Sequence, residues 1–167
     1  MNHPPAVSPR RVSSNLPTVG VALVVAAVAV LAGGAVHLHE WVTSYRHIPT
    51  FIPGSAVVRI GFPLNAAASL LGAAAIAVCA FRKSKFTPWV IVGAVLFQVT
   101  SLASLILSRT SGVFGWRETG WTAGANTTRL VEIAALTALA VAGAALAASN
   151  ERLSPNRLRT AQLRTTA

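Results

Sequence analysis

Six polar side chains lie at the ends of long apolar stretches, where charges and amides are rare. They are His37, Glu40, Arg59, Asn65, Arg129 and Glu132. Two pairs in this set are three residues apart in sequence, so the members of each pair would share a helix face. A charge inside a membrane-spanning segment is costly and normally faces a partner. The set therefore predicts either an ion-pair cluster or a ligand site.

The structural interpretation of this set needs no ligand. Arg59 or Arg129 would pair with Glu132. His37 and Asn65 would satisfy each other or nearby backbone groups, and the cluster would fix the register of the helices. Structural ion pairs are the commoner explanation of such residues. The leading hypothesis is therefore a structural or accessory membrane component of unassigned activity.

The functional interpretation is a site for a ligand or a pathway for protons. Glu132 with Arg129 and His37 could relay protons. Transporters, however, usually place their sites near the bilayer midplane on broken helices. Here the middle of each apolar stretch is mostly Ala, Leu, Val and Gly. A small transporter or ligand-binding protein is therefore the alternative hypothesis.

Metal binding is a further interpretation of the histidines. His37, His39 and His47, together with Glu40, offer nitrogen and oxygen ligands for a divalent metal. His37 and His39 are only two apart, so on one helix they would point about 200° away from each other. The spacing also matches no zinc motif. A haem is disfavoured because no histidine lies deep within an apolar stretch, and the sequence identifies no cofactor.

The sequence carries none of the common enzyme motifs. It contains no nucleophile elbow, phosphate-binding loop, HExxH motif or dinucleotide fingerprint. Its serines and threonines lack a paired base. Its one cysteine, Cys79, cannot form a disulfide within the chain. We therefore expect a protein that is not an enzyme.

The elements that must position these residues are membrane-spanning helices. Of the 167 residues, 53% are hydrophobic and only 11% are charged, compared with about 25% charged in soluble domains. The surplus apolar surface must face lipid. A helix crosses the hydrocarbon core with about 20 residues. We expect spans at about 19–41, 57–81, 87–108 and 126–149. Short connections between them predict an all-α, antiparallel four-helix bundle.

The ends of the chain differ from the spans. Residues 1–18 contain four prolines and are expected to form a disordered tail. Residues 150–167 are polar and basic and are expected to form a tail along the inner leaflet. The first span could also be a cleaved signal peptide, because an arginine pair precedes it and small residues follow it. Its apolar run is longer than that of a usual signal peptide, so we expect it to be retained.

The positions of lysine and arginine predict the orientation. Nine of the 14 flank the spans on one side: Arg10, Arg11, Arg82, Lys83, Lys85, Arg152, Arg157, Arg159 and Arg164. Cytoplasmic flanks are enriched in these residues, so both termini should be cytoplasmic and residues 37–56 and 109–125 should lie outside.

The net charge of +10 bears on the partners of the chain. The absence of a recognition motif beside the basic residues argues against nucleic acid as a partner. Anionic lipid headgroups at the cytoplasmic face are the expected partner. Assembly of the chain into a homo-oligomer or a larger membrane complex is also compatible with the sequence.

Small and polar residues three or four apart predict the contact faces of the helices. The stripes are Gly61, Asn65, Ser69, Ala73 and Ala77; Gln98, Ser101, Ser104 and Ser108; and Glu132, Ala135, Ala138, Ala142 and Ala145. The polar members fall in the predicted outer half of the bilayer. In the inner half the stripes consist of alanine and predict helix packing alone. The segments 45–49 and 115–121 are rich in turn and aromatic residues, and we expect them to form a folded cap over the outer end.

Several short motifs resemble those of small four-span membrane proteins common in actinobacteria. They are His37-Leu38-His39-Glu40-Trp41, Tyr45-Arg46-His47-Ile48-Pro49, Pro63-Leu64-Asn65-Ala66-Ala67, Phe114-Gly115-Trp116-Arg117-Glu118-Thr119-Gly120 and Val131-Glu132. The likeness covers most of residues 19–149. It implies a bacterial plasma-membrane protein with four spans. It implies no particular activity.

Overall fold

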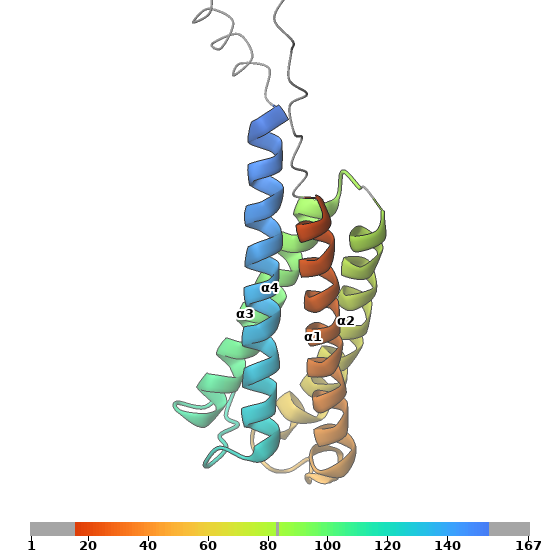
Figure 1. Ribbon diagram of the computed structural model, residues 1–167. Helices are drawn as coiled ribbons and strands as arrows, with labels where there is room; N and C mark the ends of the chain where they lie inside the picture. Colours follow the sequence, from red (N-terminus) through yellow and green to blue (C-terminus); the bar gives the residue numbers. More distant parts are fainter. Residues whose placement is uncertain (1–15, 83, 154–167) are drawn as a thin grey trace, which may run out of the picture.

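The computed structural model describes residues 16–82 and 84–153, and this part of the chain is helical (Figure 1). Its elements are α1 (Leu16–Thr43), the short 3-10 helix η1 (Tyr45–His47), α2 (Ser55–Phe81), α3 (Thr87–Arg109) and α4 (Ala123–Leu153). The predicted all-α four-helix fold is confirmed. The tails predicted at 1–18 and 150–167 fall largely outside the described residues, although α1 already begins at Leu16 and α4 continues to Leu153.

All four long helices are long and apolar enough to cross a membrane. Many large apolar side chains on their outer faces are exposed, including Val21, Leu71 and Leu96. Apolar surface of this kind is stable among acyl chains and unfavourable in water. The chain is therefore a multi-pass helical membrane protein by the length and composition of its helices.

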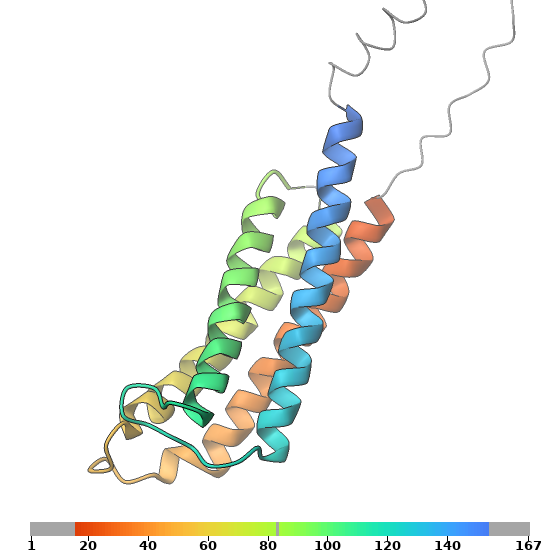
Figure 2. The same ribbon diagram turned by 90° about the vertical axis from the view of Figure 1, so that its left-hand side faces the viewer.

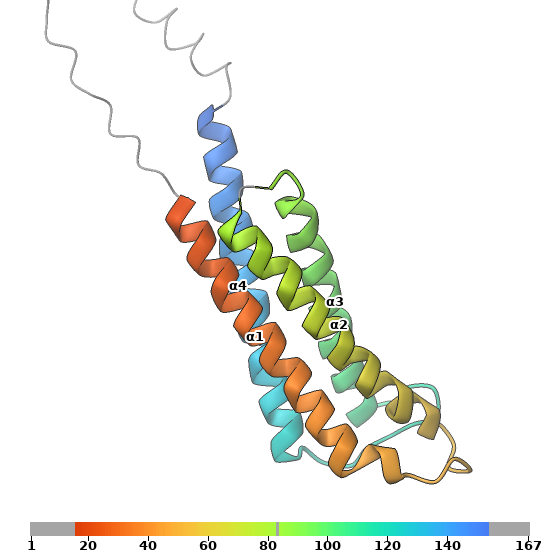
Figure 3. The same cartoon turned by 90° about the vertical axis from the view of Figure 1, so that its right-hand side faces the viewer.

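The helices run alternately up and down, so the bundle has two distinct ends (Figures 1 and 2). We call the end with η1 and the α3–α4 connection (110–122) the capped end. The opposite end, where α1 begins and α4 ends, is the tail end. Figure 1 shows α1 between α2 and α4, and Figure 3 shows α4 passing behind α1. α1 contacts both α2 and α4 extensively. α2 and α3 contact each other least among the neighbouring long helices, which leaves space between them.

The tail half of the bundle has an apolar core of small and branched side chains. Leu23 and Val30 from α1, Ile76 from α2 and Leu139 from α4 are fully buried there, with alanines filling the closer approaches. α1 and α2 approach each other closely at Gly34, where a Cβ atom would lie 2.5 Å from the Cβ of Ser69. Small residues of this kind let helix backbones pack tightly without a hydrophobic driving force.

The capped end is closed by contact between two connections. Gly54, just before α2, has φ 75°, a conformation that glycine adopts at little cost. A Cβ atom there would also collide with the backbone of Trp116. The connection 110–122 forms a tight turn in which Val113 and Trp116 exchange backbone hydrogen bonds of 2.8 Å. The predicted cap from segments 45–49 and 115–121 is therefore present as a folded structure.

Candidate functional site

One buried polar network joins all four long helices in the capped half. The hydroxyl of Ser101 on α3 donates to Oε1 of Glu132 on α4 at 2.5 Å. The amide Nδ2 of Asn65 on α2 donates to the same hydroxyl at 2.8 Å. Nε2 of His37 on α1 lies 3.6 Å from Oε1 of Glu132. Each helix thus contributes one member, so the network depends on all four helices being in register.

The network lies within the membrane-spanning segments and not at their tips. At about 1.5 Å per residue, His37 is about 9 Å from the end of α1 at Thr43. By the same rise, Glu132 is about 14 Å from the start of α4 at Ala123. Glu132 is only 2% exposed. A buried carboxylate at this depth is costly and calls for a structural or functional reason.

Part of the hydrogen-bonding capacity of this network is unused. Among the described residues, neither ring nitrogen of His37 nor Oε2 of Glu132 has a hydrogen-bond partner. The ring of His37 instead packs edge-on against Phe62, with centroids 5.1 Å apart. A buried polar atom without a partner costs about 1–3 kcal/mol. Such groups are uncommon in folded proteins, and each one needs an explanation.

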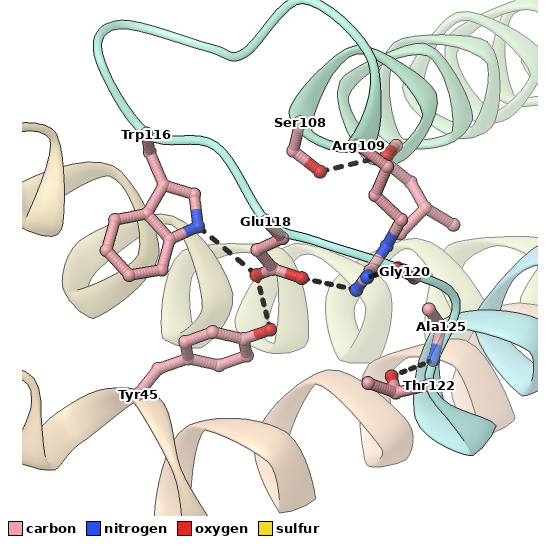
Figure 4. A network of polar contacts seen from close by, with 9 residues as sticks. Tyr45, Ser108, Arg109, Trp116, Glu118, Gly120, Thr122 and Ala125 are labelled. Atoms are coloured by element: carbon pink, nitrogen blue, oxygen red, sulfur yellow. Dashed lines mark hydrogen bonds and ion pairs between the residues drawn. The ribbon is translucent and has the colours of Figure 1, made fainter.

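A second network, centred on Glu118, holds the cap in place (Figure 4). The hydroxyl of Tyr45 and Nε1 of Trp116 both donate to Oε1 of Glu118. Arg109 forms an ion pair with Oε2 of the same carboxylate. The backbone N–H of Glu118 donates to the carbonyl of Ser108 at 2.9 Å. Because Glu118 receives contacts from η1, from α3 and from its own connection, it ties these three segments together.

A cavity of about 270 Å³ lies between α2 and α3 and connects the two networks. Its deep end is lined by His37, Asn65 and Ser101, and its capped end by Arg109 and Glu118. Its volume is just below the roughly 300 Å³ at which sites for drug-sized ligands begin. A concave space with apolar walls and a few convergent polar groups is the usual form of a small-molecule site.

The structure brings together only part of the set predicted from the sequence. His37, Asn65 and Glu132 meet in the first network, and Ser101 joins them. Glu40 instead packs against α4 at Gly124, where a Cβ atom would collide with its carboxylate.

The two arginines of the set make contacts nearer the capped end. Nη1 of Arg59 donates to the carbonyl of Ile48 at 3.1 Å. Nη2 of Arg129 donates to Asn126 Oδ1 at 3.2 Å, and its guanidinium lies 4.8 Å from the ring centre of Trp121.

The expected pairing of Arg59 or Arg129 with Glu132 is wrong for the described structure, where Glu132 contacts His37 and Ser101. Side chains on a helix lean toward its N-terminus, and α2 and α4 both begin at the capped end. Both arginines precede the network along their helices, so both lean away from it. Residue spacing placed them near Glu132, but side-chain direction separates them.

The three histidines considered as metal ligands are not brought together. α1 continues unbroken to Thr43, so His37 points into the bundle while His39 is exposed. His47 is also exposed and accepts a hydrogen bond of 2.9 Å from Nε of Arg46. The described ranges contain no group of three His, Cys, Asp or Glu residues that could hold a metal ion.

Sequence reasoning missed Arg109 and Glu118 as members of the site. The signal was present, because segment 115–121 was recognised as a folded cap, and Ser101 and Ser108 belonged to a polar helix stripe. What the sequence did not reveal is that the cap carboxylate meets an arginine at the end of α3 across a connection.

Comparisons with known proteins identify no relative of this chain. No protein-family model, curated protein or solved structure matches this chain.

Proposed function

We propose that this chain is a non-enzymatic component of a bacterial plasma membrane that binds a small ligand in the cavity between α2 and α3. One observation carries the proposal: a buried polar network with unused hydrogen-bonding capacity borders a cavity at membrane depth. Ionisable residues inside membrane spans usually face a partner or a cavity and mark sites for substrates or ions.

A purely structural network is the competing explanation, and the cavity argues against it. A network that only fixed helix register would be surrounded by packed side chains, as in the tail half. Here Asn65 and Ser101 line open space, and the long helices that border it, α2 and α3, contact each other little. A ligand seated between them would supply the missing packing.

The placement of the site follows from the distribution of charge. The capped end would face outward and both termini would be cytoplasmic, because nine of the 14 lysines and arginines flank the tail end. Anionic lipid headgroups of the inner leaflet would attract the lysines and arginines at the tail end. The likeness of the short motifs to actinobacterial four-span proteins supports a bacterial plasma membrane.

Filling the cavity tests this function directly. Gly61 lines the cavity, and a Cβ atom there meets nothing within 4 Å. Gly61→Phe should therefore fold and occupy the ligand space. Gly72 lies on the same helix, outside the cavity lining, and also has no neighbour within 4 Å of a Cβ atom, so Gly72→Phe is the matched control.

Native mass spectrometry of protein released from its own membrane gives the readout. We expect a small-molecule adduct on the unmodified protein and on Gly72→Phe, and its loss from Gly61→Phe. An adduct that survives Gly61→Phe, or no adduct on any of the three, would contradict ligand binding in this cavity.

A further inference from the structure

The wall of the α2–α3 cavity is rich in aromatic rings. Phe62 comes from α2, Phe97 from α3, and Phe114 and Trp116 from the cap. The faces of aromatic rings carry negative potential and attract organic cations, and quaternary ammonium groups are recognised by cages of such rings. Rings from three segments around one small space favour a cationic ligand over an anionic one.

The charges around the cavity also favour a cation. The charged or titratable groups in or beside it include His37, Arg109, Glu118 and Glu132, and Tyr45 adjoins it through its hydrogen bond to Glu118. Arg109 and Glu118 form an ion pair and balance each other. Glu132 lies directly behind Ser101, whose hydroxyl donates to it. Within the described part of the chain, no lysine or arginine lies within 4.0 Å of Glu132.

The wall facing the ligand presents an oriented hydroxyl. The hydroxyl of Ser101 donates a hydrogen bond to Glu132 and accepts one from Asn65. A hydroxyl oxygen has two lone pairs, so one remains for the cavity. The negative charge behind this oxygen and the lone pair on its exposed side act in the same direction, toward a positive or donating group.

Resting on the ligand-binding function proposed above, we propose that the ligand is a small organic ammonium ion. Its charge is balanced by Glu132 through Ser101, and its alkyl groups contact the rings of Phe62 and Phe97. The volume of about 270 Å³ restricts the ligand to a small one. A free ammonium compound and the headgroup of a lipid share this chemistry.

Two probes of equal shape separate charge from size. Choline carries a trimethylammonium group, and dimethylbutanol is its uncharged isostere with carbon in place of nitrogen. Both can be followed through their methyl signals in ligand-observed NMR titrations, with the full chain in a nonionic maltoside detergent. We expect choline to bind about tenfold more tightly than dimethylbutanol, as a partly desolvated cation–π and charge interaction would give.

Glu132→Gln should remove this preference while keeping the shape of the side chain. The control is Glu151→Gln, which changes an exposed carboxylate at the far end of α4 and should keep the preference. A preference that persists in Glu132→Gln would overturn the role of this carboxylate.

Phe97→Leu tests the aromatic wall independently, and it keeps the inference testable if Glu132→Gln fails to fold. It retains an apolar side chain but loses the ring. Choline affinity should fall about threefold, with little change for dimethylbutanol. The control Phe86→Leu alters an exposed ring outside the cavity. Equal losses for both probes in Phe97→Leu would contradict the cation–ring contact.

The two proposals fail in different ways. Equal binding of the two probes, blocked for both by Gly61→Phe, would overturn the ammonium inference and leave ligand binding intact. No binding of either probe overturns the ammonium inference, and loss of the native adduct signal as well overturns both proposals.

Repeating the titration in phosphatidylcholine nanodiscs identifies the source of the ammonium group. Weaker apparent binding of free choline there supports a lipid headgroup as the natural occupant. Unchanged binding supports a free compound.

Discussion

The two halves of this bundle contain similar helices but are held together differently. In the tail half, Leu23, Ile76 and Leu139 are completely buried and alanines bring the helices close. In the capped half, the buried positions include His37, Ser101 and Glu132, and a cavity separates α2 from α3. Close apolar contact therefore provides the stability of one half, whereas the other half gives up packing for a cavity with apolar walls and a few polar groups.

This contrast runs along single helices. On α4, Glu132 is followed on the same face by Ala135, Leu139 and Ala142, all fully buried. One turn of helix thus separates a buried carboxylate from a dry core. The chain can tolerate the unpaired groups of the capped half because the tail half holds the same four helices together. The following variants test this division, from the largest expected effect to the smallest.

Leu139→Ala should be the most damaging. Its side chain is fully buried at the centre of the tail half, and truncation leaves a void that costs about 2–5 kcal/mol. Thermal unfolding in detergent, followed by circular dichroism, measures the loss. The exposed Leu71 on α2 provides a control, because Leu71→Ala should change the free energy of unfolding little. Comparable losses for both variants would mean that the tail half is not the stabilising half.

Gly34→Ala should have the next largest effect. The added Cβ atom would lie 2.5 Å from the Cβ of Ser69, so α1 and α2 must separate. Overpacking of this kind costs about 1–3 kcal/mol. The neighbouring Gly33→Ala is a close control, since its Cβ atom meets Val131 at an ordinary 3.5 Å. Similar melting temperatures for the two variants would show that the close approach at Gly34 does not limit packing.

Glu118→Gln should destabilise the cap more than the bundle. The substitution removes the ion pair with Arg109 while leaving an acceptor for Tyr45 and Trp116. We expect faster amide hydrogen exchange across residues 110–122 with little change in the tail half of α4. Uniformly faster exchange along every helix would mean that the cap and the bundle unfold as one unit.

Glu132→Gln should have the smallest effect on stability. The amide oxygen can still accept from Ser101, and removing a buried charge offsets the lost contact with His37. We expect the free energy of unfolding to change by less than about 1 kcal/mol, while the preference for choline over dimethylbutanol is lost. A large drop in folded yield would instead support the structural interpretation of the network.

The sequence alone was enough to predict four helices long and apolar enough to span a membrane, and to predict that the polar and apolar halves of the bundle differ. Apolar length determines where a helix can cross a bilayer, and the polar members of the helix stripes already fell at one end. Contacts between side chains were harder to predict. Arg129 lies three residues from Glu132, yet it leans toward Trp121.

The cavity was beyond the reach of periodicity. It lies between α2 and α3, and the contact between Glu118 and Arg109 borders its capped end. That contact crosses a connection whose path no repeat of apolar residues describes. Residue types identified His37, Asn65 and Glu132 as candidates, and only the arrangement of the helices showed that Ser101 links Asn65 to Glu132.

The glycine at position 54 has a practical consequence for topology mapping. Its backbone lies so close to that of Trp116 that the 44–54 and 110–122 connections pack directly against each other there. A reporter inserted into either connection would push apart both and open the cavity beneath them. Fusions that leave the molecule intact belong instead at the turn between α2 and α3, which lies at the opposite end of the bundle (Figure 1).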